Sequence, residues 1–224
     1  MSNPQAKPAT FVGADDWTFE YREKSNPVNS NLDLLTYGVC RITVGGAGQA
    51  IAYPDQEALL FCTRGAAEAT LGGQAYALDH YDVLYVPRGE PFDLRQTGEE
   101  PAEIVVCRAP AENVHPVRHA RWAEMSKDES RIRHLKGKDV FLMFDVSEPA
   151  DKLIAGYTIY EPHTRAWPAH NHTDQEEVYI FPKGHGAIAP IGVDKLGGLL
   201  SDRGLCLAAS HAGGPTRPTA NASR

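Results

Sequence analysis

The stretch WPAHNHTDQEEVYIF, residues 167–181, combines a histidine pair, a polar turn and an apolar run typical of a strand. His170 and His172 are two residues apart, so on a β-strand both imidazoles project from one face. Residues 173–175 are polar and short enough for a hairpin turn, and Glu177 follows at the start of the apolar run. Its carboxylate can therefore return to the same point from the neighbouring strand. Two imidazoles and a carboxylate form a ligand set for a divalent transition metal.

Strand parity distinguishes the two adjacent glutamates of this stretch. With Glu177 facing the metal, Tyr179 faces it as well. Glu176, Val178 and Ile180 then point to the opposite face of the strand. The other register would turn the two apolar side chains into a polar cavity, so Glu177 is the preferred ligand. A solvated turn with two surface histidines is the alternative interpretation.

Short β-rich runs recur along the chain, with turn residues at intervals of about ten residues. They cover residues 38–44, 57–64, 67–71, 81–87, 102–108, 139–146, 152–160 and 176–181. Several alternate between two faces, as strands with one buried face do. A Gly72-Gly73 step between two of these runs predicts a hairpin, because glycine adopts positive φ without cost. Helical patterning is weak, so the spacing predicts an all-β sandwich or barrel.

Composition and charge exclude several classes of protein. The 224 residues include 22 Lys and Arg and 29 Asp and Glu, so the net charge is 22 − 29 = −7. Duplex-DNA binders normally carry a basic surface, so we expect no nucleic-acid partner. No apolar run approaches the roughly 18 residues of a membrane span, and the N-terminus lacks a signal-peptide core. We therefore expect a cytoplasmic protein without a membrane partner, whose four widely spaced cysteines are reduced.

The metal stretch resembles a known family. His-x-His, four residues and then Glu-Val-Tyr, preceded by Trp167 and Pro168, is similar to the metal signature of the cupin family of 5-keto-4-deoxyuronate isomerase and 5-deoxy-glucuronate isomerase. The family pattern is W-x-x-P-x-H-x-H-x(4)-E-V-Y, and here the proline stands one place earlier. The sequence YALDHYDVLYVPRGEPFDL, residues 76–94, also resembles the metal-free N-terminal cupin of that family. The likeness covers residues 30–186.

The resemblance implies a double-stranded β-helix (cupin) fold with two tandem barrels, the second of which the atypical C-terminus could leave incomplete. The expected organisation is an N-terminal arm over 1–29, a metal-free cupin domain over 30–110, a connector over 111–137, a metal-binding cupin domain over 138–210 and a disordered tail over 211–224. Residues 118–135 are the longest stretch with helical character. We interpret them as part of the connector, because the sequence before them is polar and interrupted by proline.

The C-terminal sequence departs from the family pattern. The family has a fourth metal ligand, a histidine that lies downstream of the glutamate. A strand with the pattern Gly-Asp…Pro precedes this histidine. After Gly186 the chain lacks a clear alternating strand and that turn. His211 is the histidine in the right neighbourhood, a few residues early, and is the candidate fourth ligand; a solvent-exposed histidine is the alternative. This departure suggests a truncated or altered C-terminus.

The resemblance also implies a reaction, the isomerisation of a deoxy uronate in sugar-acid or inositol catabolism. A divalent metal, with Zn the first expectation and Mn or Fe as alternatives, can polarise the carbonyl and stabilise the enediolate. Tyr179 is the candidate catalytic proton donor. Arg165 and Lys183 flank the metal strands and are the candidate substrate-binding cations, with a solvated surface role as the alternative. The residues do not identify the general base.

Two other functions are compatible with the same residues. Two histidines and one carboxylate also form the facial triad of non-haem iron dioxygenases, which occur on cupins. A non-catalytic sugar-binding cupin is the third interpretation, favoured if the fourth ligand is missing. The expected partners are a small-molecule sugar acid and further copies of this chain in a homo-oligomer.

Overall fold

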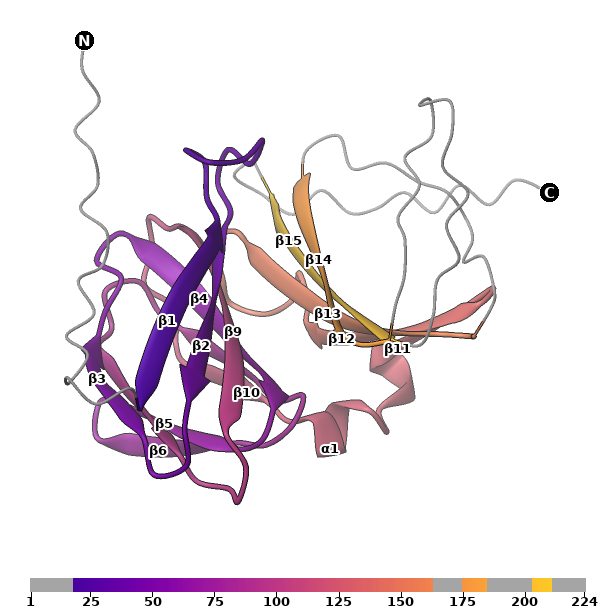
Figure 1. Ribbon diagram of the computed structural model, residues 1–224. Helices are drawn as coiled ribbons and strands as arrows, with labels where there is room; N and C mark the ends of the chain where they lie inside the picture. The colour runs from indigo at the N-terminus through magenta and orange to yellow at the C-terminus, as the bar shows by residue number, and fades with distance from the viewer. Residues whose placement is uncertain (1–17, 163–174, 185–202, 211–224) are drawn as a thin grey trace, which may run out of the picture.

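The computed structural model describes residues 18–162, 175–184 and 203–210, and it is built almost entirely from antiparallel strands (Figure 1). The strands are β1 (Phe19–Ser25), β2 (Thr36–Ile42), β3 (Ala47–Ile51), β4 (Gln56–Arg64), β5 (Ala67–Leu71), β6 (Gln74–Leu78), β7 (Val83–Val86), β8 (Phe92–Gln96), β9 (Ala102–Pro110), β10 (Arg118–Ala120), β11 (Ile132–Leu135), β12 (Lys138–Phe144), β13 (Leu153–Tyr160), β14 (Gln175–Lys183) and β15 (Arg203–Ser210). A short helix, α1 (Trp122–Met125), and a 3-10 turn (Glu129–Arg131) lie between β10 and β11. The predicted all-β class is confirmed.

The described strands form three sheets. A six-stranded sheet has the order β1-β2-β9-β4-β7-β10, and a four-stranded sheet has the order β3-β8-β5-β6. These two sheets make up the first half of the molecule, residues 18–120. A five-stranded sheet with the order β11-β12-β13-β15-β14 belongs to the second half, which comprises residues 132–162, 175–184 and 203–210.

Two apolar cores flank the six-stranded sheet. One core lies between this sheet and the four-stranded sheet and contains Leu60 and Leu94, both fully buried. The other lies between the six-stranded and five-stranded sheets, where the Tyr85 ring stacks on Phe144 with centroids 5.2 Å apart. Because both faces of the sheet are covered, β4 and β9 are continuous apolar runs rather than alternating ones. The halves therefore share a core across their interface.

The five-stranded sheet repeats the pairing pattern of the six-stranded sheet. β2 pairs with β1 and β9, and β9 pairs with β4. In the same way β13 pairs with β12 and β15, and β15 pairs with β14. The order β1-β2-β9-β4 thus corresponds to β12-β13-β15-β14. By this correspondence β14 is the counterpart of β4, and β13 is the counterpart of β2.

Several segments differ from the sequence-based expectation. The expected N-terminal arm contains β1, which is an edge strand of the six-stranded sheet. The expected connector contributes β10 to the six-stranded sheet and β11 to the five-stranded sheet. The expectation that no clear strand follows Gly186 was wrong, because β15 pairs with both β13 and β14. A strand between two others can be covered on both faces, and it then shows no alternation. The tail over 211–224 lies outside the described residues.

The hairpin predicted at Gly72-Gly73 is confirmed. Leu71 of β5 pairs with Gln74 of β6 around this two-residue turn. Both glycines have positive φ, +53° and +81°, as the favoured two-residue hairpin turns require. No helix in the described part of the chain is long and apolar enough to cross a membrane.

Candidate metal strand

Strand β14 carries the predicted site residues that the structure describes. These are Glu177, Tyr179 and Lys183. The other predicted residues, Arg165, His170, His172 and His211, lie outside the described residues. Within the described ranges no group of three His, Cys, Asp or Glu side chains is close enough to hold a metal ion.

Glu177 and Tyr179 share the face of β14 that turns away from the first half. Val178 is buried in the core between the halves, and Ile180 packs against that core. Their neighbours on the strand must then point to the opposite face. The Tyr179 hydroxyl donates a hydrogen bond to Oε2 of Glu177 at 2.5 Å, which fixes the two side chains together. This is the register that strand parity favours.

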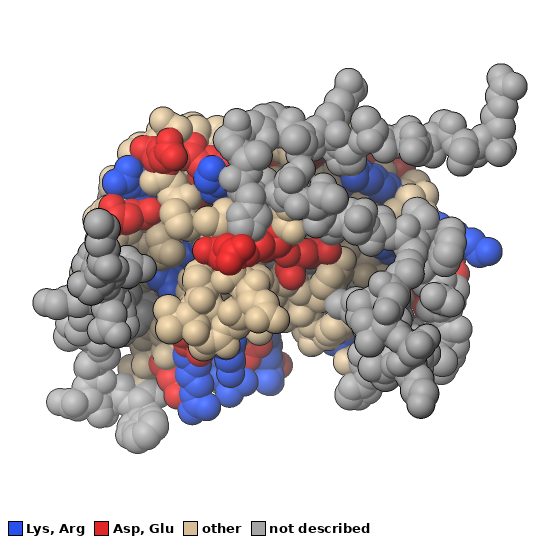
Figure 2. Space-filling model, turned by 90° about the horizontal axis from the view of Figure 1, so that it is seen from above, with Lys and Arg blue, Asp and Glu red and all other residues tan. Residues whose placement is uncertain are grey.

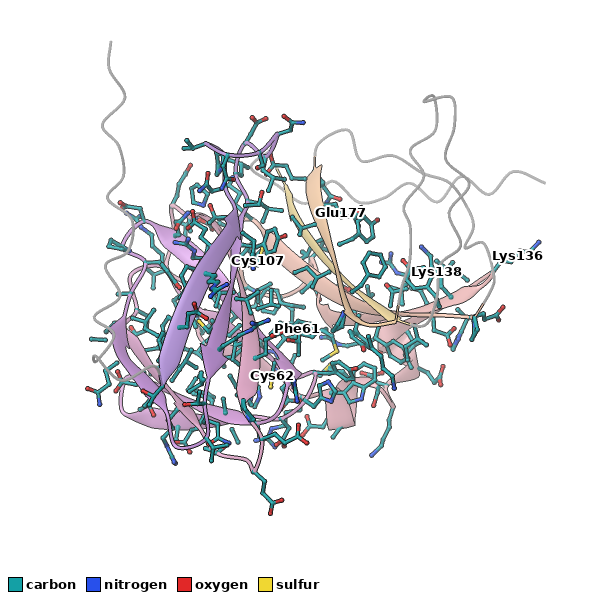
Figure 3. The ribbon with its side chains drawn as sticks, in the orientation of Figure 1. Phe61, Cys62, Cys107, Lys136, Lys138 and Glu177 are labelled. Carbon is teal, nitrogen blue, oxygen red and sulfur yellow. The ribbon has the colours of Figure 1, made fainter. Side chains whose placement is uncertain are left out.

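The geometry at Glu177 suits a metal ligand. Its side chain is half-buried, so the carboxylate is neither enclosed in the core nor fully hydrated. Carboxylates that bind metals are themselves hydrogen-bonded by a further residue, and Tyr179 supplies such a contact here. Figure 3 shows Glu177 on the upper part of β14, whereas Lys136 and Lys138 lie at the right-hand edge of the sheet.

Lys183 lies at the other end of the strand. It is exposed and six residues beyond Glu177, which corresponds to about 20 Å of extended chain. The β14–β15 register also shifts between Ile180 and Lys183, so the strand is irregular in between. The structure therefore does not bring Lys183 close to Glu177.

Glu176 points to the opposite face and binds the backbone of the first half. Its Oε2 accepts hydrogen bonds from the N–H groups of Leu34 at 2.9 Å and Leu35 at 2.8 Å, and its Oε1 accepts one from the N–H of Asp33. These three residues immediately precede β2. We call this arrangement the Glu176 clasp. It ties the first residues of β14 to a segment more than 140 residues earlier in the chain.

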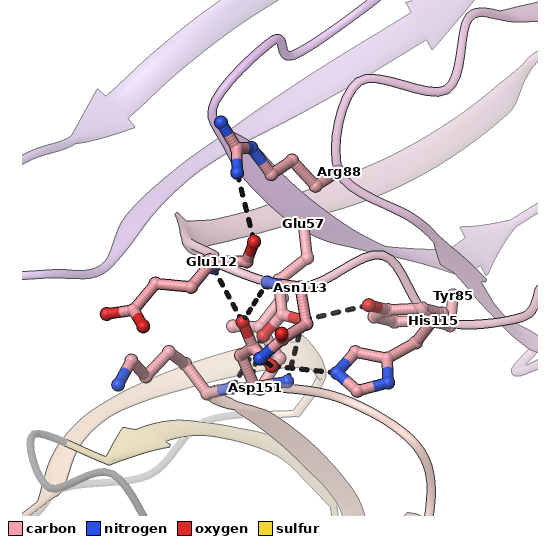
Figure 4. A network of polar contacts seen from close by, with 9 residues as sticks. Glu57, Tyr85, Arg88, Glu112, Asn113, His115 and Asp151 are labelled. Atoms are coloured by element: carbon pink, nitrogen blue, oxygen red, sulfur yellow. Dashed lines mark hydrogen bonds and ion pairs between the residues drawn. The ribbon is translucent and has the colours of Figure 1, made fainter.

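Glu57 makes the corresponding contact in the other direction. It is fully buried at the second position of β4, and it accepts hydrogen bonds from the N–H groups of Asp151, Lys152 and Leu153 at 2.9, 2.7 and 2.9 Å. This is the Glu57 clasp (Figure 4). The Tyr85 hydroxyl donates a further hydrogen bond to Glu57 at 2.8 Å. Burial, and then the nearby Glu57 charge, raise the pKa of Tyr85, so it stays a neutral donor.

Neither clasp was predicted from the sequence, although the sequence contains a signal for both. Gln-Glu opens β4 at 56–57 and β14 at 175–176, and the clasped segments both have the pattern Asp-x-Leu-x-x-Gly, at 33–38 and 151–156. These matches align only once the strand pairing has shown which strands correspond. They indicate that the two sheets are copies of one unit.

The first half has a different side chain where the second half has Glu177. The counterpart of Glu177 is Ala58, which pairs across the sheet with Arg108. Arg108 is buried and lies with its guanidinium 4.4 Å above the Tyr53 ring. It donates hydrogen bonds to Glu23 at 2.6 Å and to the Tyr21 hydroxyl at 3.3 Å. A cation that belongs to the chain itself thus occupies this end of the first half.

The surface charge bears on which substrates can approach. Seen from above, a band of acidic side chains crosses the middle of the molecule (Figure 2). With a net charge of −7, the chain repels an anionic ligand at long range. An acidic substrate would therefore need basic side chains close to where it binds.

Solved structures with a similar fold include three that this chain matches over most of its length. An IolB-like protein from Salmonella typhimurium is 17% identical, with a TM-score of 0.60 over 86% of this chain and 84% of that one. The protein YlbA from E. coli is 15% identical, with a TM-score of 0.60 over 86% and 78% of the two chains. A putative glyoxylate-induced protein from Pseudomonas aeruginosa is 14% identical, with a TM-score of 0.57 over 88% and 77%. These likenesses confirm the cupin-like fold.

Sequence comparison assigns the family. No curated protein sequence matches the chain. The model of the KduI/IolB family, however, matches residues 17–183, a range that includes both Gln-Glu pairs and Glu177. Because this match covers well over half of the 224 residues, the chain belongs to the KduI/IolB family.

Proposed function

We propose that this protein is a metal-dependent ketol-isomerase that acts on a deoxy uronate, either 5-deoxy-glucuronate or 5-keto-4-deoxyuronate. Membership of a family of isomerases of this type supports the proposal. The observation that carries it is the carboxylate of Glu177, held by the Tyr179 hydroxyl on the face of β14 that turns away from the first half. The same face and strand position would be needed for a ligand shared with His170 and His172.

The proposed metal ligands are His170, His172 and Glu177, with His211 as the fourth. Imidazole and carboxylate donors suit Zn first, and Mn or Fe as alternatives. When bound, such an ion polarises a carbonyl oxygen and stabilises the negative charge that develops as the α-proton leaves.

The remaining roles fall to side chains around this position. Tyr179 can hold a proton next to Glu177, because its hydroxyl already donates to that carboxylate. We assign Arg165 and Lys183 to the substrate carboxylate, since a guanidinium or an ammonium offsets the repulsion from the acidic chain. The distance of Lys183 along β14 makes Arg165 the stronger candidate of the two.

We further propose that the protein works as a homo-oligomer in a reducing cytoplasm. The thiols of Cys40, Cys62 and Cys107 are free and buried, and burial raises the pKa of each to about 12. Thiols of this kind pack as small apolar groups and are chemically inert. Light scattering of the purified chain tests the oligomeric state.

Metal analysis of the purified wild-type, His170→Ala and Glu177→Ala proteins tests the proposed site. We expect about one equivalent of divalent metal in the wild type, and isomerisation of one of the two uronates. Both variants should lose the metal and the activity together. Equal metal content in all three proteins would reject the site.

The same preparations distinguish the other functions. Oxygen consumption by an iron-loaded protein would identify a dioxygenase instead, because isomerisation needs no oxygen. A protein that binds metal but converts neither uronate would be a non-catalytic sugar-binding cupin.

A further inference from the structure

Glu176 is bound more firmly than its position at the start of a strand requires. Three consecutive backbone N–H groups of the first half converge on its carboxylate. Successive N–H groups that point to one place form an anion-binding nest, and a hydrogen bond to a charged acceptor is about twice as strong as a neutral one. The contact is therefore a strong anchor between the halves.

The anchored residue is adjacent to the proposed metal ligand. β14 lies at the end of the described five-stranded sheet, where it pairs with β15, beginning at Gln175 opposite Ser210. Among the described residues β14 has a paired neighbour on one side, so the contacts that its side chains make help to fix its twist and register. Glu176 fixes one face of β14 toward the first half. Strand geometry then requires the next side chain, Glu177, to point the other way.

We propose that Glu176 is a positioning residue for Glu177, and that the first half of the molecule thereby sets the metal affinity of the second. The proposal rests on the function proposed above. Residues 33–35 hold the Glu176 carboxylate, the carboxylate holds the start of β14, and the strand presents Glu177 with its Tyr179 partner. In this arrangement the first half acts on β14 through the clasp, in addition to the apolar packing of Val178 in the shared core.

The Glu57 clasp provides a matched control. Glu57 stands at the same position of the corresponding strand and also accepts three consecutive backbone N–H groups across the interface. The residue after Glu57, however, is Ala58, which cannot bind a metal. Breaking either clasp weakens the interface between the halves, but only the Glu176 clasp adjoins Glu177.

The experiment compares full-length wild type, Glu176→Gln and Glu57→Gln. Glutamine preserves the size of the side chain, removes its charge and places an NH₂ donor against the backbone N–H groups. The apparent Zn²⁺ affinity is measured by competition with a chromophoric chelator, and the melting temperature is measured on the metal-free proteins. We expect both variants to melt about 5 °C below wild type. Only Glu176→Gln should also bind Zn²⁺ about 10- to 100-fold more weakly.

Three results would overturn the proposal. In the first, both variants retain wild-type affinity, so that the clasp stabilises the fold without affecting the metal. In the second, both lose affinity equally, which would mean a general effect of the interface. In the third, neither Glu176→Gln nor the milder Glu176→Asp folds, so that Glu176 is needed for the whole fold. Failure of the wild type to bind Zn²⁺ would instead reject the proposed function itself.

Discussion

Strands β4 and β14 occupy corresponding places in their sheets, are both nine residues long and both begin with Gln-Glu. They differ at the next position, which is Ala58 in the first half and Glu177 in the second. Across the sheet, Ala58 pairs with Arg108, whereas Glu177 pairs with Ala208. One copy of the unit thus has a cation built into the chain at this place. The other has a carboxylate at this place, which we propose as a metal ligand.

The two halves share the contacts that join them and differ on the opposite face of the corresponding strands. The residues that join the halves are the same in both copies: Glu176 binds the backbone just before β2, and Glu57 binds the backbone at the start of β13, the counterpart of β2. The residues on the opposite strand face have diverged. The shared contacts therefore maintain the architecture, and under the proposed function the divergent position 177 places a metal ligand in the second half.

Arg108→Met should have the largest effect on the first half. It removes the buried guanidinium, breaks the ion pair with Glu23 and takes away the cation that lies over the Tyr53 ring. We expect a loss of about 3 kcal/mol in the free energy of unfolding, because the variant loses the hydrogen bonds of a buried guanidinium to Gln56, Tyr21 and the exposed Glu23. Urea denaturation measures this loss. Because Arg108 lies in the first half and the proposed metal ligands lie in the second, the Zn²⁺ affinity of the variant should equal that of the wild type. A loss of Zn²⁺ affinity together with the loss of stability would contradict this expectation.

Asp151→Asn should have an intermediate effect and would sharpen the comparison at the interface. The Asp151 carboxylate accepts hydrogen bonds from the N–H groups of Glu112 and Asn113 and contacts His115 at 2.7 Å. Burial alone would raise the pKa of Asp151, but the hydrogen bonds from Asn113, His115 and Glu112 outweigh it and hold this pKa well below its usual range. We expect a loss of about 2 kcal/mol at neutral pH.

The pH dependence of this loss provides the check. A carboxyl whose pKa is lowered by folding stabilises the protein fully above its unfolded value of 3.8 and loses that contribution as the pH falls through the folded value. The stability difference between wild type and Asp151→Asn should therefore be constant at neutral pH and shrink below pH 3.8. Melting temperatures recorded down the acid range measure it. A difference that grows in acid would show that Asp151 is not held as its charged form.

Tyr179→Phe should have the smallest effect, confined to the second half. The counterpart of Tyr179 in the first half is the apolar Leu60, so the variant makes the two copies more alike. It removes the hydroxyl that donates to Glu177 but preserves the ring. We expect Zn²⁺ affinity to fall about tenfold with little change in stability. Unchanged affinity would show that the hydrogen bond does not orient the carboxylate.

The sequence predicts the central strands well and the edges poorly. The runs at 57–64 and 102–108 correspond to β4 and β9, because a strand covered on both faces is apolar throughout. β3 is largely exposed and β10 has three residues, so neither has a pattern of its own, and pairing with a neighbour defines both. Pairing between segments distant in sequence cannot be read from local periodicity.

The polar contacts of the interface show the same limit. Glu57 opens an apolar run, and the residues next to it do not explain why its charge is buried. Its backbone partners follow 94 to 96 residues later. The strand face of Glu177 was easier to predict from the sequence, because the His-x-His pair, the short turn and strand parity are all local features. Its register on β14 could therefore be predicted, whereas the role of Glu176 required the folded chain.

The double covering of the six-stranded sheet has a consequence for any attempt to divide the molecule. A fragment that ends before β11 would leave Leu59, Phe61 and Tyr85 on an uncovered face, next to the buried charge of Glu57. Such a fragment would self-associate through this face or collapse. The second half thus covers an apolar face of the first, and the two halves are expected to fold as one unit.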